Sequence, residues 1–294
     1  MNSLIDFLSN PNTQWVLTGS ILLGFASGLI GSFVLLKKQS LIGDAMAHAT
    51  LPGVCIAYII SGVKSTPLFL TGAALTGLLA TYFIQAIVKH SRIKTDASIG
   101  VVLSVFFGIG IVLLTYITKN MGGNQSGLDD FIFGQAASMV RGDIQTIAVG
   151  SFLIILFTSL FFKEFKIAVF DPNYAKGLGI PVGLINSILM ALVIGVVVVG
   201  IQMVGVVLIA ALLITPPLAA RYWTDRLGLM SFISGIIGAL SGVVGTTVST
   251  IGEGLPTGPL IVLVTSALFL LSLLFGKSKG LITRFFISKG VRHT

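Results

Sequence analysis

The sequence predicts an all-α fold, a polytopic membrane bundle of about nine transmembrane helices forming one domain over residues 1–294. The composition is the first reason, because 54% of the residues are hydrophobic and only 10% are charged, whereas soluble domains carry about 25% charged residues. The second reason is a series of long apolar runs. The third is the placement of lysine and arginine, which also predicts the orientation.

The apolar runs are long enough to cross a bilayer. A helix needs roughly 20 apolar residues to span ~30 Å of hydrocarbon, where only helices satisfy their own backbone groups. Such runs occupy residues 13–36, 45–63, 65–88, 97–118, 144–162, 182–220, 229–250 and 257–275. A single helix over 182–220 would extend roughly 58 Å. We therefore predict a break near Gly200-Ile201-Gln202, which gives nine helices.

The basic residues predict an N-terminus outside the cell and a C-terminus in the cytoplasm. With that orientation, 15 of the 18 lysines and arginines fall in cytoplasmic segments and only Lys64, Lys119 and Arg141 fall outside, as the positive-inside rule requires. The net charge of +8 is thus explained by topology, and no nucleic-acid partner is predicted. The predicted location is a cell membrane, so lipid is part of the solvent.

One apolar run carries a pair of metal-binding side chains. Asp44 and His48 are four residues apart and therefore project from one face of a helix. Ionisable groups in a membrane span are costly and usually face a cavity or a partner. A carboxylate oxygen and an imidazole nitrogen suit a divalent transition metal. Pro52 and Gly53 follow one turn later and can interrupt the helix.

Two ligands are too few for a metal site. A homodimer with this face on its two-fold axis would supply two aspartates and two histidines, making each chain half of a pore. Spacing alone leaves an alternative open, in which Asp44 caps the helix and His48 pairs with it without binding anything.

A cytoplasmic segment carries the signals of a short helix outside the bilayer. Its sequence is Asp171-Pro172-Asn173-Tyr174-Ala175-Lys176-Gly177-Leu178-Gly179-Ile180-Pro181. Asp-Pro favours a helix start, and the glycines and the second proline favour its end. The segment is either an ordinary connector or a docking helix for a cytoplasmic partner.

Three further residues are candidates for a gate. Pro216 and Pro217 are expected to end or kink their helix, and a flexible gate there is the alternative. Glu253 lies in the outer turn before the last helix, where it is either a solvated charge or part of the pore mouth. Pairs of small residues, Gly24 with Gly28 and Gly238 with Gly242, predict close helix contacts.

The chain has no motif for hydrolysing ATP. Gly276-Lys277-Ser278 is similar to the end of a P-loop, but position 271 is leucine where that motif requires glycine. Metalloprotease and nucleophile-elbow motifs are also missing from the sequence. We therefore expect a transport subunit rather than an enzyme, with any ATP hydrolysed by another chain.

At four segments the chain resembles the metal-ion permeases of the ABC-3 family. These are Ser40–Gly53 (SLIGDAMAHATLPG), Asp171–Pro181 (DPNYAKGLGIP), Val204–Ala220 (VGVVLIAALLITPPLAA) and Leu255–Leu260 (LPTGPL). Their order and spacing extend the resemblance over nearly the whole chain. The family commonly has glutamate where Asn173 stands, a difference that removes one charge and bears only on individual docking contacts.

The resemblance implies a homodimeric permease of an ATP-binding-cassette importer. It implies two cytoplasmic ATPase subunits and an extracytoplasmic lipoprotein that delivers the metal. It also implies that Asp44 and His48 line the path and that Asp171–Pro181 contacts the ATPase. No permanently bound cofactor is expected. The transported substrate would be Mn²⁺, which we favour, or Zn²⁺ or Fe²⁺.

Three alternatives remain at this point. A permease for a metal chelate would tolerate the loss of Asp44 and His48 better than a permease for the bare ion. A proton-coupled secondary transporter would need no ATPase. An intramembrane enzyme would need a catalytic set, and the sequence offers none that we recognise.

Overall fold

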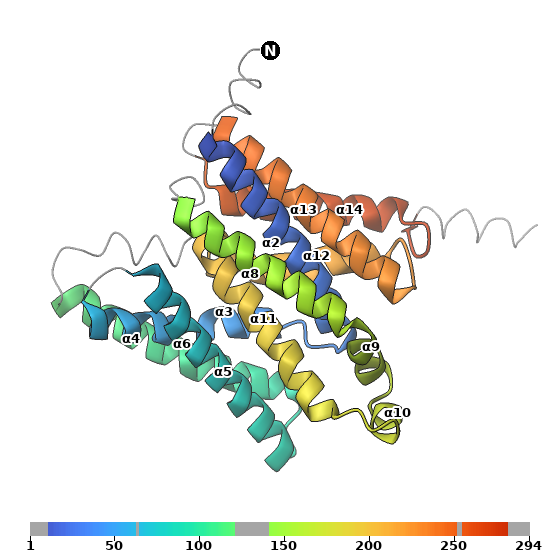
Figure 1. The fold of residues 1–294 in the computed structure, drawn as a ribbon, viewed down its shortest axis with the longest axis horizontal. Coiled ribbons are helices and arrows are strands. Elements are labelled where there is room, and N and C mark those ends of the chain that lie inside the picture. The colour runs from blue at the N-terminus through green and yellow to red at the C-terminus, as the bar shows by residue number, and fades with distance from the viewer. Residues whose placement is uncertain (1–10, 63–64, 121–140, 252–254, 282–294) are drawn as a thin grey trace, which may run out of the picture.

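Figure 1 shows the fold in a computed structural model, which describes residues 11–62, 65–120, 141–251 and 255–281. Within those ranges all regular secondary structure is helical. The helices are α2 (Pro11–Leu36), α3 (Ile42–Ala49), α4 (Leu51–Ser61), α5 (Thr66–His90), α6 (Thr95–Asn120), α8 (Arg141–Leu160), α9 (Phe162–Phe170), α10 (Pro172–Gly177), α11 (Val182–Val204), α12 (Val206–Arg221), α13 (Leu227–Ile251) and α14 (Thr257–Phe275).

The predicted helical membrane bundle is confirmed. Among the described residues, 8 helical segments are long and apolar enough to cross a membrane. One of them, Ile42–Ser61, comprises α3 and α4 together. α12, with 16 residues, is a shorter apolar helix beside these spans. The 9-residue helix α9 was not predicted as a separate element.

The helices form two groups with α8 and α11 between them (Figure 1). α2 packs with α12, α13 and α14, whereas α3, α4, α5 and α6 pack with one another. α3 also contacts α11 and α12, so this short helix lies where the two groups meet. α6, α8 and α14 are the least buried of the spanning helices, and their exposed apolar side chains suit contact with lipid.

The contact between α2 and α13 depends on small residues. A Cβ atom on Gly24 would lie 2.3 Å from the carbonyl oxygen of Gly238, and one on Gly28 would lie 2.3 Å from that of Ser234. Gly242 is packed against α2 in the same way. The Ser234 hydroxyl donates a hydrogen bond of 2.6 Å to the Gly28 carbonyl. The close helix contact predicted from these glycines is confirmed, and it leaves no room for a side chain.

The break in the long apolar run lies at Gly205, so the prediction at Gly200-Ile201-Gln202 is wrong in position. α11 continues through Val204, and Gly205 then adopts a φ of 87°, a conformation that glycine tolerates and other residues rarely adopt. Gly200 has a packing role instead, because a Cβ atom there would lie 2.4 Å from the Ile209 side chain of α12. The two helices thus fold back onto each other.

The proline pair does not end its helix, so that part of the prediction is wrong, whereas the predicted kink stays a prediction. Pro216 and Pro217 lie inside α12, which continues to Arg221. Both prolines are buried, and Pro217 packs where α2 presents Gly31. Packing against α2 and α13 therefore sustains the helix in spite of two missing backbone donors. The structure describes no residue from 252 to 254, so Glu253 lies outside it.

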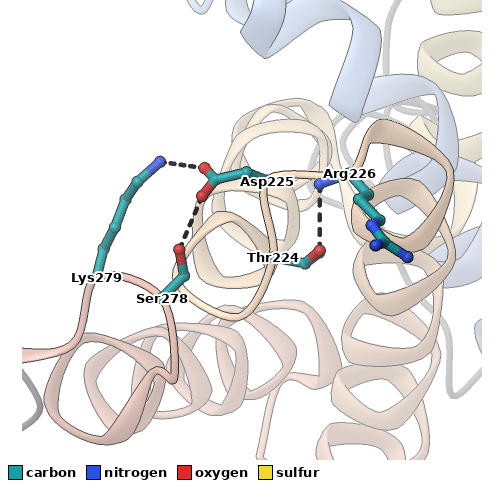
Figure 2. Close-up of polar contacts among 5 residues, drawn as sticks. All are labelled: Thr224, Asp225, Arg226, Ser278 and Lys279. Atoms are coloured by element: carbon teal, nitrogen blue, oxygen red, sulfur yellow. Dashed lines mark hydrogen bonds and ion pairs between the residues drawn. The ribbon is translucent and has the colours of Figure 1, made fainter.

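The loop after α12 is tied to the segment that follows α14 (Figure 2). Asp225 accepts a hydrogen bond of 2.9 Å from the Ser278 hydroxyl and forms an ion pair with Lys279. The hydrogen bonds from Lys279 and then from Ser278 hold the pKa of the Asp225 carboxyl below its ordinary value. In the same loop the Thr224 hydroxyl accepts from the Arg226 backbone N–H, just before α13 begins.

Candidate metal-translocation site

The candidate site is built on α3. Asp44 lies in the first turn of this helix and His48 in the last. Ile42, Ala45, Met46 and Ala49 occupy the other face and are buried, which fixes the rotation of the helix. The side chains of Asp44 and His48 are left 41% and 22% exposed.

The two side chains meet. Asp44 Oδ1 lies 3.5 Å from His48 Nε2, as the spacing of four residues predicts. Asp44 does not cap the helix, because the residue at the cap position is Leu41 and no side chain caps it. The alternative reading of the sequence held that Asp44 caps the helix and that His48 pairs with Asp44. The cap is therefore wrong, while the pairing is correct.

The helix carrying the pair is interrupted just after His48. α3 ends at Ala49 and α4 begins at Leu51, so the interruption lies at Thr50, before the expected Pro52-Gly53. Pro52 has no N–H to donate to the His48 carbonyl four residues earlier. The Thr50 hydroxyl donates a hydrogen bond of 2.7 Å to the Ala47 carbonyl at this interruption.

α6 supplies one wall of the site. The rings of His48 and Phe107 meet edge to face, with their centroids 4.7 Å apart and an angle of 68° between their planes. Phe107 is 38% exposed, so it borders the site without sealing it. This contact orients the imidazole. The sequence did not predict it, because no local signal links residues on separate helices.

One copy of the chain supplies only these two ligands. In the part of the chain that the structure describes, no group of three or more His, Cys, Asp or Glu residues lies close enough to hold a metal ion. A carboxylate and an imidazole that are partly exposed within a candidate span need water or a partner to solvate them. The site is therefore open on the side away from the α3 core.

The predicted short helix after Asp171 is present as α10, and its position on the cytoplasmic side stays a prediction. Asp171 Oδ1 accepts hydrogen bonds from the backbone N–H groups of Asn173 at 3.1 Å and Tyr174 at 2.9 Å, so the aspartate is the N-cap. Pro172 is the first helical residue. Gly179 has a φ of 78°, the left-handed conformation that favours glycine after a helix.

α10 and the residues that flank it carry three exposed apolar side chains at one end of the molecule, next to α9 (Figure 1). Phe170 at the end of α9, Tyr174 in α10 and Leu178 just after α10 are 61%, 58% and 53% exposed. Only Ala175 of the 6 helix residues is buried. Exposed apolar side chains on a short, capped helix are typical of a protein-binding surface. Asn173 is exposed beside them.

The family comparison matches residues 9–276 to the ABC 3 transport family. The chain is 57% identical over 274 residues to "Manganese transport system membrane protein MntC" of Bacillus subtilis (strain 168), which covers 93% of this chain and 63% of that protein. It is 42% identical to "Zinc transport system membrane protein TroC" of Treponema pallidum (strain Nichols) over 96% of this chain and 95% of that protein. The chain thus spans less than two thirds of the Bacillus protein.

Two solved structures share the fold. "PsaBC from Streptococcus pneumoniae in complex with Fab" superposes with a TM-score of 0.83 at 32% identity, covering 98% of this chain and 99% of that one. A second structure, of a putative metal-chelate type ABC transporter in an inward-facing conformation, has a TM-score of 0.69 at 15% identity over 88% of this chain and 84% of that one. The second likeness concerns the fold alone.

Proposed function

Because the chain belongs to the ABC 3 transport family, we propose that it is the permease subunit of an ATP-driven importer of divalent transition metal ions, with Mn²⁺ as the favoured substrate. The observation that carries the proposal is the pairing of Asp44 and His48, half-exposed on a helix that is otherwise buried. The manganese and zinc systems named among its relatives support this substrate class.

The donor set fits such a substrate. An oxygen and a nitrogen ligand together suit Mn²⁺, Fe²⁺ and Zn²⁺ better than Ca²⁺ or Mg²⁺. A second copy of the chain supplies another aspartate and another histidine across a two-fold axis, which raises the number of protein ligands to four. Binding must be weak enough for release, because a transport site has to let its ion leave.

Two groups of partners follow from the proposal. Two cytoplasmic ATPase subunits bind the exposed side chains of Phe170, Tyr174 and Leu178, and movement of α10 passes directly into α11, which follows it in the chain. An extracytoplasmic metal-binding lipoprotein delivers the ion from outside. These exposed apolar side chains and the N-cap of α10 support the first assignment, and family membership supports the second.

Metal uptake by site variants tests the proposal. Asp44→Asn and His48→Gln keep the side-chain volumes but weaken or remove the ligands. We expect radiolabelled Mn²⁺ uptake to fall at least roughly tenfold, since even outer-shell partners of metal ligands contribute that much. Asp96→Asn and His90→Gln are matched controls, because both residues are exposed and lie outside the site. Full uptake by both site variants, with the ATPase still bound, would refute the assignment.

A further inference from the structure

A largely apolar cavity that also contains basic and amide groups lies at the end of the bundle where α2 ends. It has a volume of about 300 Å³ and lies between the α2–α3 connection, the last turns of α5, the start of α6 and the first turns of α11. Lys37 and Lys89 bring positive charge to it, and Gln39 and Asn186 bring amides. Its size is that of a small-ligand pocket. It is separate from the pair of Asp44 and His48, neither of which lines it.

No described carboxylate balances the positive charge in this cavity. Lys37 Nζ donates one hydrogen bond of 3.0 Å to Asn186 Oδ1, and no carboxylate in the described ranges lies within ion-pair distance of Lys37 or Lys89. Burial lowers the pKa of Lys37 to about 8. A desolvated ammonium group with spare donors favours an anion beside it.

Gln39 adds a second unsatisfied group. Its Oε1 atom is buried without a hydrogen-bond partner in the described structure. Rotation of the amide exchanges its oxygen and nitrogen at little cost in shape, so the same position can present two N–H donors. With Lys37 and Lys89, these donors converge on one small volume. That set of groups is suited to the oxygens of a phosphate.

The surroundings of the cavity indicate where the phosphate comes from. The cavity lies at helix ends, next to the basic segments that the positive-inside rule assigns to the cytoplasmic interface. Ile84, Val88 and Met190 provide apolar surface beside the two lysines. Tyr82, Phe83 and Leu184 on the adjacent surface are exposed. A cationic pocket with apolar walls at the membrane interface matches a lipid headgroup joined to its acyl chains.

We propose that this cavity binds the phosphate of an anionic phospholipid from the cytoplasmic leaflet. Lys37 and Lys89 contact the phosphate, the Gln39 amide donates to it, and the apolar residues of α5 and α11 contact the glycerol and the first acyl carbons. The bound lipid joins the α2–α3 connection to α5 and α11. Its binding does not depend on metal transport.

Native mass spectrometry of the purified full-length chain tests the site. The chain is released from mixed micelles that contain equal amounts of dioleoyl phosphatidylglycerol and dioleoyl phosphatidylcholine, and the retained lipids are counted. We expect the chain to retain phosphatidylglycerol preferentially. Each of Lys37→Gln and Lys89→Gln should lower that retention about fivefold, the equivalent of ~1 kcal/mol per basic residue.

A control that removes lysines outside the cavity distinguishes a specific lipid site from general electrostatic attraction of anionic lipid. The double variant Lys38→Gln/Lys94→Gln removes two exposed lysines near the same interface that do not line the cavity, and it should retain lipid like the unaltered chain. Lys37→Arg/Lys89→Arg should also retain it. Lys89 is exposed, so Lys89→Gln remains informative even if a Lys37 variant fails to fold.

Three outcomes would overturn the proposal. The first is equal loss of phosphatidylglycerol from the cavity variants and the Lys38/Lys94 control. The second is displacement of the lipid by millimolar inorganic phosphate, which would make the cavity a site for free phosphate. The third is unchanged lipid retention combined with loss of the ATPase from Lys37→Gln/Lys89→Gln, which would assign the cavity to an acidic side chain of that partner. None of these readouts depends on Asp44 or His48.

Discussion

Three side chains matter most at the residue scale, the pair of Asp44 and His48 and, in different surroundings, Lys37. Asp44 Oδ1 and His48 Nε2 lie 3.5 Å apart, so a metal ion that enters between them replaces an existing contact. The ion also requires a neutral imidazole, because a protonated nitrogen cannot ligate. Among the described residues, Lys37 has only the neutral Asn186 side chain as its hydrogen-bond partner, so its charge is poorly compensated.

The titration of Lys37 is a direct measure of that imbalance. Burial places its folded-state pKa at about 8, below the ordinary value of 10.5. Between these two values the unfolded chain holds a proton that the folded chain has released, so this group's contribution makes the folded state more stable as the pH rises from 8 to 10.5.

We expect the ¹³C resonance of reductively methylated Lys37 to titrate with a midpoint of about 8 in neutral detergent, assigned by its loss in Lys37→Gln. Bound phosphatidylglycerol should raise the midpoint, because an anion favours the charged form. A midpoint that stays near 10.5 without lipid would show that the ammonium group is well solvated and would contradict this account.

At the scale of the elements, glycine contacts determine how closely helices approach. α2 and α13 approach so closely at Gly24 and Gly238 that a Cβ atom on either would lie 2.1 to 2.3 Å from a backbone oxygen. Backbone atoms cannot move aside as a flexible side chain can. α4 and α5 meet in the same way at Gly53 and Gly72.

Gly24→Ala should therefore separate α2 from α13. We expect it to destabilise the folded chain by about 1–3 kcal/mol, the usual cost of overpacking, with a lower thermal unfolding temperature in detergent. Gly100→Ala is the matched control, because nothing lies within 4 Å of a Cβ atom at Gly100 in α6 and alanine favours a helix over glycine. Equal behaviour of the two variants would contradict the packing argument.

α10 yields a prediction about assembly. The side chains of Tyr174 and Leu178 are exposed and make little contribution to the fold, so Tyr174→Ala/Leu178→Ala should leave the thermal stability of the isolated chain unchanged. The ATPase should no longer co-purify with this variant, because its apolar contact surface is removed. Leu263→Ala on α14, where the residue is 64% exposed, is the control. Normal co-purification of the double variant would place the docking surface elsewhere.

At the scale of the whole molecule, the two groups of helices leave α3 between them with one open face. That face carries half of the proposed ligand set. The exposed apolar residues of α6 continue from it through Phe107 and Ile111. A second copy that covered this surface would complete the site and remove a costly exposure of charge within the membrane.

Cross-linking tests the proposed pairing of two chains. His48→Cys is introduced into a Cys55→Ala background, since Cys55 is the only cysteine of the chain. We expect a short bifunctional maleimide to link two copies through position 48 in membranes. Leu263→Cys should remain uncrosslinked under the same conditions. If only the α14 variant formed dimers, the two-fold axis would not pass near α3.

The sequence alone predicted the helical membrane fold, because a span needs a continuous apolar run and such runs are visible without any tertiary information. It also predicted local features that depend on a few neighbouring residues. The cap by Asp171, the start of α10 at Pro172 and the shared face of Asp44 and His48 are of this kind.

Only the tertiary structure decided the features that depend on contacts between distant segments. The break lies at Gly205 rather than Gly200 because Gly200 is needed for packing against Ile209. α12 continues through Pro216 and Pro217 because it packs against α2 and α13. The ring of Phe107 beside His48 and the unpaired charge of Lys37 near Lys89 arise between different helices. Local sequence cannot determine such contacts, since packing free energy depends on which surfaces meet.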